Sequence, residues 1–326
     1  MSKLFNKINR RITRIAQTYS IDSTFSKKLA NYRFIDELSW KLHFAKISTF
    51  YHDKKDEWIL DYLYNKLHTQ IEKYKDDTDI GVKETNPPIW VCWWSGEEDA
   101  PALVKQCIKS TRKNAGDHPV YLITENNYTE YIDIPSYILN KVMSGKMCIA
   151  NFTDYLRVSL IEKYGGLWLD ATIFCSKQIP EECFEASFYT CKSLPVKSRY
   201  ISQFRWTSFC LGGRKKHVFY RFFKEALETY WHDEDVSIDY LLVDYIIETA
   251  YRYLPTVKQC MDELLPNNPH RDDLQAAMNS ALSAENWSNI INNDTVLYKL
   301  SWRETYSHKT VNGEQSIYDY FLNMDI

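Results

Sequence analysis

The chain has 326 residues, a formal net charge of −3 and a charged fraction of 25%, which is the composition of an ordinary soluble globule. The slight negative charge argues against a nucleic-acid partner, because nucleic-acid-binding proteins usually carry a strongly basic face. No apolar run of about 18 residues occurs, so no transmembrane helix is predicted. The first residues lack the apolar block of a signal peptide, and the eight cysteines form no C-x-x-C pair. A cytoplasmic protein with reduced thiols is therefore predicted.

Residues 1–85 are predicted to be helical, because they contain no glycine before Gly81 and almost no turn signals. Near the start, four apolar residues recur at helical spacing with five basic residues between them: Leu4, Ile8, Ile12 and Ile15, with Lys3, Lys7, Arg10, Arg11 and Arg14. A basic amphipathic helix of this kind can lie on an anionic membrane surface. A helix packed on its own domain with a solvated basic face fits the pattern equally well.

After Asn86-Pro87-Pro88 the pattern alternates between strands and helices. The predicted elements of this first part are buried strands at 89–94, 120–123 and 167–174, and a helix at 148–164 that ends at a glycine pair. Short strands are predicted at 188–191, 208–211 and 296–300. This alternation predicts an α/β fold with a mostly parallel sheet flanked by helices.

Two domains are predicted from this organisation. Residues 1–85 form an N-terminal helical segment, which faces a membrane surface or an acceptor. Residues 86–326 form the α/β domain, with a helical insertion at about 215–285 and a helical C-terminal part.

Three charged residues stand out within the α/β pattern. Asp154 and Arg157 are spaced i,i+3, so they share one face of the predicted helix. Asp170 lies at the end of the following strand, and ligands of open α/β sheets bind beyond the carboxyl ends of the strands. The three side chains are therefore predicted to face one crevice. The alternatives are an ordinary surface ion pair for Asp154–Arg157 and a turn or helix cap for Asp170.

Such a crevice suits a nucleotide sugar. Carboxylates accept hydrogen bonds from ribose and sugar hydroxyls, and a diphosphate needs positive charge from arginine or from a divalent cation. The diphosphate is also the leaving group in glycosyl transfer. Positive charge placed there stabilises the transition state more than the ground state.

The segment from Ala150 to Thr172 resembles the signature of the capsular polysaccharide synthesis proteins, which are related to family 32 glycosyltransferases of the retaining GT-A type. The matching residues are Ala150, Asp154, Arg157, Tyr164-Gly165-Gly166, Trp168 and Asp170. The stretch from Pro87 to Trp94 is similar to the strand that opens the family's fold. The resemblance covers roughly residues 86–175 and implies a GT-A type, Rossmann-like sheet.

The resemblance also implies roles for the site residues. Trp93 is expected to stack on the nucleotide base, and Asp154 and Arg157 are expected to hold the sugar and the ribose-diphosphate region. Trp90 or Trp94 is an alternative exposed ring, because neighbouring residues of a strand point to opposite faces. A purely structural role for Trp93 is a further alternative.

Asp170 and Thr172 occupy the positions of the two acids in the family's Asp-x-Asp metal motif. The resemblance implies Mn²⁺ or Mg²⁺, but the hydroxyl of Thr172 is a poorer ligand for these ions than a carboxylate. Glu304 and His308 of the C-terminal tail are therefore candidate ligands beside Asp170.

The resulting hypothesis is a hexosyltransferase. It uses a nucleotide sugar, with a uridine diphosphate sugar as the expected donor, and extends a lipid-linked polysaccharide at the inner face of the cell membrane with retention of configuration. No catalytic base or nucleophile is identified. Two alternatives remain: a catalytically idle nucleotide-sugar binder, which Thr172 would explain, and a membrane-surface scaffold without a donor site.

Overall fold

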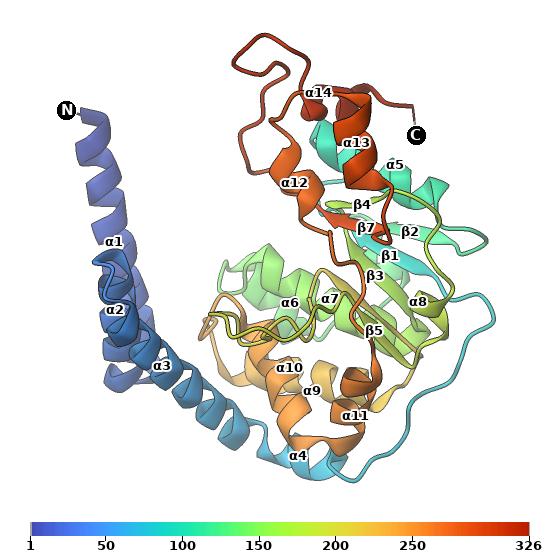
Figure 1. Ribbon diagram of the computed structural model, residues 1–326. Helices are drawn as coiled ribbons and strands as arrows, with labels where there is room; N and C mark the ends of the chain where they lie inside the picture. Colours follow the sequence, from blue (N-terminus) through green and yellow to red (C-terminus); the bar gives the residue numbers. More distant parts are fainter. Residues whose placement is uncertain (1, 326) are drawn as a thin grey trace.

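Four helices fill the first part of the chain in the computed structural model, which describes residues 2–325 and, within this range, the side chains from residue 13 onward. They are α1 (Ser2–Phe25), α2 (Lys27–Lys41), α3 (Ala45–Lys66) and α4 (His68–Tyr74). Helices α1 to α3 form an arm at one side of the molecule (Figure 1). The predicted helical start is therefore confirmed, although the side chains of Leu4, Ile8 and Ile12 and of Lys3, Lys7, Arg10 and Arg11 lie outside the described residues.

A five-stranded sheet forms the centre of the remaining chain, in the order β2-β1-β3-β6-β5. Its strands are β1 (Ile89–Cys92), β2 (Val120–Ile123), β3 (Gly166–Asp170), β5 (Phe188–Thr190) and β6 (Cys210–Gly213). Strand β1 pairs in parallel with β2 and β3, whereas β6 is antiparallel to both of its neighbours. All strands except β6 thus run the same way, which confirms the predicted parallel-rich sheet.

Helices cover both faces of this sheet (Figure 1). The α-helices after α4 are α5 (Ala102–Lys113), α6 (Ser136–Met143), α7 (Ile149–Tyr164), α8 (Glu182–Glu185), α9 (Val218–Asp233), α10 (Leu242–Tyr253), α11 (Pro255–Glu263), α12 (Asp273–Ala277), α13 (Ala284–Ile291) and α14 (Ile317–Asn323), with a short 3₁₀ turn at Tyr128–Glu130. Trp90 and Trp168 are register partners and pack into the core with α7, α9 and α10. Their neighbours Val91 and Leu169 pack into the opposite core, with α5 and α14. This alternation produces three layers.

The predicted single strand from Leu167 to Phe174 is wrong. The chain forms β3 and then β4 (Ile173–Cys175), and β4 pairs antiparallel with β7 (Leu297–Lys299) in a separate two-stranded sheet. The apolar pattern could not reveal the break, because both strands are buried and the intervening Ala171 and Thr172 are buried too. The break matters because it leaves Asp170 at the end of β3.

The helical arm shares contacts with the α/β part. Helix α3 packs against α10, and α4 packs against α9. The division into domains at residue 86 stays a prediction.

The junction between α7 and β3 is unusually tight. Gly165 ends α7 with φ of +70°, and Gly166 begins β3 with φ of +97°. A Cβ atom on Gly166 would lie 2.1 Å from the carbonyl oxygen of Pro88. The indole N–H of Trp90 donates to the carbonyl of Gly165 at 3.0 Å. These contacts fix the end of α7 against the start of β1 and β3.

We expect Gly166→Ala to reduce the free energy of unfolding by more than about 3 kcal/mol, because it adds a clash with Pro88 to the strain of a positive φ. Gly96→Ala is the matched control: its φ is +86°, and a Cβ there meets nothing within 4 Å. The control should cost only about 1 kcal/mol. Urea denaturation measures both. If both variants lose the same free energy of unfolding, the close contact between Gly166 and the carbonyl oxygen of Pro88 does not constrain the fold.

Candidate functional site

A cleft of about 640 Å³ opens where β1 and β3 end. Its walls come from the ends of these strands, the first half of α7, the start of α10 and the segment that follows β7. The polar and aromatic residues lining it include Trp93, Trp94, Asp154, Arg157, Trp168, Asp170, Thr172, Tyr240, Lys299, Trp302 and Arg303. The structure therefore brings the predicted residues Trp93, Asp154, Arg157, Asp170 and Thr172 to one cleft.

Arg157 lies at the centre of this site. It is only 5% exposed, its Nη1 lies 3.0 Å from Asp154 Oδ1, and its Nη2 lies 3.1 Å from Asp170 Oδ1. The guanidinium also lies over the ring of Trp168, 5.0 Å from its centroid. The alternative of a surface ion pair is thus excluded. Removing one partner of such a buried cluster would leave an uncompensated charge.

Asp170 is held by three donors. Its Oδ1 accepts from Arg157 and, at 3.1 Å, from the indole N–H of Trp168, while its Oδ2 accepts from Lys299 Nζ at 2.9 Å. Burial acts to raise the pKa of this carboxyl, but the charges of Lys299 and Arg157 outweigh burial and lower the pKa to about 2. Asp170 is therefore ionised at neutral pH.

Asp154 has a different protonation behaviour from Asp170. Burial raises the pKa of Asp154 to about 7, because the lowering effect of Arg157 is smaller and the carboxylates of Asp170 and Asp244 also act to raise it. The two acids on either side of Arg157 thus differ widely in pKa. Near neutral pH, Asp154 can accept or donate a hydrogen bond to a ligand hydroxyl.

The three tryptophans of the first strand region have separate environments. Trp90 is 2% exposed and belongs to the core, so it is not the exposed ring. Trp93 and Trp94 follow β1, are half-buried and line the cleft. Trp93 packs edge-on against Trp302 with centroids 5.7 Å apart. The cleft therefore offers aromatic surface from two segments that are far apart in the chain.

Three buried donor atoms of the cleft residues lack a hydrogen-bond partner among the described residues. They are the indole Nε1 of Trp93 and the Nε and Nη1 of Arg157, although Nη1 is within ion-pair distance of Asp154. Buried donors without partners are costly unless a ligand or water satisfies them. All three are therefore candidate ligand contacts.

Lys299 is a site residue that the sequence interpretation missed. Besides Asp170, its Nζ donates to Thr172 Oγ1 at 2.7 Å. The signal was available, because Lys299 lies near the end of the predicted strand at 296–300, and the strand-end rule was applied only to Asp170. Tyr240, Trp302 and Arg303 also line the cleft without having been assigned a role.

Glu304 and His308, the predicted additional metal ligands, are not brought to Asp170. Neither lines the cleft, and His308 pairs with Asp319 of α14 instead. Within residues 2–325 there is no group of three or more His, Cys, Asp or Glu side chains that could hold a metal ion. This part of the predicted ligand set is corrected: the long tail segment after β7 directs Trp302 and Arg303 into the cleft, and His308 turns towards α14.

Fold and cleft together define an α/β protein with a cleft at the strand ends that is lined by charged and aromatic side chains. A family model described as "Capsular polysaccharide synthesis protein" matches residues 39–321. The chain belongs to that family.

Two curated proteins are similar to parts of the chain. The O-glycosyltransferase braB of Annulohypoxylon truncatum is 27% identical over 105 residues, covering 29% of this chain and 25% of that protein. The O-glycosyltransferase PaGT of Phomopsis amygdali is 23% identical over 164 residues, covering 45% of this chain and 39% of that protein. The chain thus matches well under half the length of either relative.

Among solved structures, the PaToxG glycosyltransferase aligns with 73% of this chain and 94% of its own chain. The sequence identity is 11% and the TM-score is 0.38. This similarity is too low to establish a shared fold.

Asp154→Asn provides a test of the raised pKa of Asp154. The pKa of an aspartate in the unfolded chain is about 4, so the folded state retains a proton between about pH 4 and 7, and the group's contribution to stability falls as pH rises through this window. Asparagine does not titrate. The melting temperature of the variant relative to the wild type should therefore rise between pH 5.5 and 8.5, as measured by scanning calorimetry.

Asp235→Asn is the control for this pH experiment. Hydrogen bonds from Lys146 and Lys141 lower the pKa of Asp235, so its contribution to stability is fully present above about pH 4 and is lost only at lower pH. The difference in melting temperature between this variant and the wild type should therefore be the same at pH 5.5 and 8.5. A pH-independent difference for Asp154→Asn as well would contradict the raised pKa.

Proposed function

We propose that this protein is a glycosyltransferase that transfers a hexose from a nucleotide sugar to a growing polysaccharide. The observation that carries the proposal is the buried cluster of Asp154, Arg157 and Asp170 in an aromatic-lined cleft at the strand ends. Membership of the capsular polysaccharide synthesis family supports it, as do the two relatives named O-glycosyltransferases.

The cleft residues suit the parts of such a donor. Arg157, Lys299 and Arg303 line one cleft and offer positive charge to a diphosphate. Asp154 can hold sugar hydroxyls, and the ring of Trp93 can stack on the nucleotide base. Charge placed at the departing diphosphate stabilises the transition state selectively. We take uridine diphosphate sugars as the donor class and retention of configuration as the outcome, both on the strength of the family resemblance.

The proposal is tested by measuring hydrolysis of a panel of nucleotide sugars without acceptor. Arg157→Lys keeps the charge but loses the planar fork that contacts two groups at once. We expect this variant to lower kcat/KM for the selected donor by at least ~10-fold, which corresponds to about 1.4 kcal/mol.

Arg112→Lys is the matched control for Arg157→Lys. Arg112 donates through both Nη atoms to Glu97, at 2.8 Å each, on an exposed surface outside the cleft. The control should have wild-type kinetics. Equal kinetics for both lysine variants would show that the donor does not bind in this cleft. If no nucleotide sugar is consumed, either alone or with suitable acceptors, the proposal that the protein is an enzyme would be contradicted.

A second proposal concerns the membrane, where a lipid-linked acceptor would lie. The turn between α2 and α3 exposes large apolar side chains, with Trp40 57% and Phe44 56% accessible. The other exposed members of this apolar tip are Leu38, Leu42, Ile47 and Phe50. No acid lies between Glu37 and Asp53, whereas Lys41 and Lys46 do. Apolar and basic side chains on one exposed surface suit an anionic bilayer.

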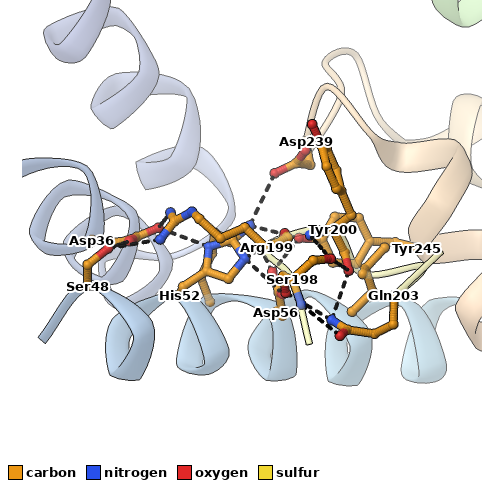
Figure 2. Close-up of polar contacts among 12 residues, drawn as sticks. Asp36, Ser48, His52, Asp56, Ser198, Arg199, Tyr200, Gln203, Asp239 and Tyr245 are labelled. Atoms are coloured by element: carbon orange, nitrogen blue, oxygen red, sulfur yellow. Dashed lines mark hydrogen bonds and ion pairs between the residues drawn. The ribbon is translucent and has the colours of Figure 1, made fainter. Parts of the chain in front are cut away.

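The arm is attached to the α/β part through a buried polar network (Figure 2). Asp36 accepts hydrogen bonds from Ser48 and Arg199, each at 2.6 Å, and contacts His52 at 3.0 Å. Burial acts to raise the pKa of Asp36, but these hydrogen bonds outweigh it and the pKa falls well below its usual value. Asp36 is therefore ionised, and the charge of Arg199 pairs with it.

The same network reaches the start of α10 (Figure 2). Tyr245 of α10 donates to Asp56 of α3 at 2.5 Å, and Arg33 of α2 pairs with Asp239 at 2.9 Å. Tyr240, which follows Asp239, lines the cleft. The arm is thus linked to the rim of the cleft, so a membrane contact at the apolar tip would set the orientation of the cleft towards an acceptor.

None of the described helices is long and apolar enough to cross a bilayer.

Replacing both Trp40 and Phe44 by serine should weaken binding to vesicles that contain an anionic phospholipid by at least ~10-fold. The reason is the loss of about 1.5–3 kcal/mol of burial for each large apolar side chain that enters the lipid. Sedimentation with vesicles measures the binding. The control replaces Leu265 and Val311 by serine; these residues are 76% and 104% exposed and do not belong to the helices of the arm. If the control variant loses as much binding as the tip variant, the arm is not the membrane contact.

A further inference from the structure

The family resemblance implies a divalent cation at Asp170 and the residue two positions later, and the structure places a lysine ammonium there. We propose that Lys299 takes the place of the metal ion and that sugar transfer in this protein needs no divalent cation. This inference rests on the proposed function and specifies how its site handles the diphosphate.

The position of the ammonium is the first observation. Lys299 Nζ lies 2.9 Å from Asp170 Oδ2 and 2.7 Å from Thr172 Oγ1. It therefore bridges the two positions that correspond to the acids of the metal motif. An ammonium has three N–H donors, and these two contacts are its hydrogen bonds within the described residues. Because Lys299 lines the cleft, the third donor remains for a phosphate oxygen of a bound ligand.

The remaining groups do not fit a metal ion. Both carboxylate oxygens of Asp170 already accept hydrogen bonds, from Arg157 and Trp168 on one oxygen and from Lys299 on the other. Thr172 offers a neutral hydroxyl in place of a second carboxylate. Asp170 already contacts the fixed positive charges of Arg157 and Lys299, so a divalent ion bound to the same carboxylate would be repelled by both of them.

The backbone holds Lys299 in this position. Lys299 pairs with Ile173 in the β4–β7 ladder, and its N–H donates to the carbonyl of Arg271 at 2.8 Å. The N–H of Leu300 donates to the carbonyl of Thr172 at 2.9 Å. The two-stranded sheet therefore fixes the lysine and the threonine relative to each other, as a built-in cation site requires.

The chemistry assigned to Lys299 is electrostatic. During transfer, the bond between the anomeric carbon and the diphosphate oxygen breaks, and its electron pair stays on the diphosphate. A new bond forms from the anomeric carbon to the acceptor hydroxyl oxygen, whose proton passes to the departing diphosphate. Lys299 supplies fixed positive charge beside the oxygen that becomes negative, which is the contribution that a metal would otherwise make.

The test uses the full chain after dialysis against EDTA, with the hydrolysed nucleotide sugar as substrate. Wild-type activity should be unchanged within about 2-fold by EDTA or by added Mn²⁺. Lys299→Met should lower kcat/KM by at least ~100-fold. Lys177→Met is the matched control, because Lys177 donates a hydrogen bond to the carbonyl of Asn293 at 2.7 Å on an exposed surface near the same small sheet and does not line the cleft. That control should keep wild-type activity.

Mn²⁺ binding, followed by electron paramagnetic resonance of the free ion, provides a readout that does not depend on turnover. The wild type should leave Mn²⁺ free, whereas Lys299→Ala combined with Thr172→Asp should bind it. Activity that disappears in EDTA and returns with Mn²⁺ would overturn the inference and leave the glycosyltransferase proposal standing. If no nucleotide sugar is hydrolysed, the proposed function fails. In that case the Mn²⁺ experiment still tests the inference, because tight Mn²⁺ binding by the wild type at this site would overturn it. If a Lys299 variant does not fold, the activity of the wild type in EDTA and its Mn²⁺ binding still test the inference.

Discussion

The burial of one guanidinium between two carboxylates is the interaction on which the cleft depends. Arg157 is charged and almost fully covered, so it is stable there only because Asp154, Asp170 and the Trp168 ring surround it. Breaking such a buried set typically costs about 3–5 kcal/mol. The tight glycine junction connects α7, which carries Asp154 and Arg157, to β3, which carries Asp170, so that the two aspartates contact different Nη atoms of the arginine. The parallel pairing of β3 with β1 brings the tryptophans that follow β1 to the same cleft.

Much of this arrangement could be predicted from local sequence. The i,i+3 spacing placed Asp154 and Arg157 on one helix face, and the apolar run after Gly166 placed Asp170 at a strand end. The parallel-rich sheet followed from the alternation of strands and helices. The turn at Ala171 and Thr172 could not be predicted, because both residues are buried. The pattern of apolar residues indicates which residues are buried, but it does not show where the chain changes direction.

Long-range pairing explains the remaining misses. Lys299 reaches Asp170 only because β7, 129 residues later in the chain, pairs with β4. The position of Lys299 near the end of a predicted strand was visible in the sequence, but the pairing that brings it to Asp170 was not. The absence of a second acid at Thr172 was visible in the sequence, but the sequence alone did not show that Lys299 lies beside this hydroxyl. The neutral hydroxyl and the ammonium are complementary, since one accepts the hydrogen bond that the other donates.

The measurement that tests the central claim most directly is a crystal structure with the nucleotide sugar that the protein hydrolyses, grown in EDTA and again with Mn²⁺. The account predicts the diphosphate within hydrogen-bond distance of Lys299 and Arg157, the sugar beside Asp154, and no metal density in either crystal. A metal ion that bridges Asp170 and the diphosphate, with Lys299 displaced, would contradict the role of the lysine. A nucleotide bound outside this cleft would contradict the site itself.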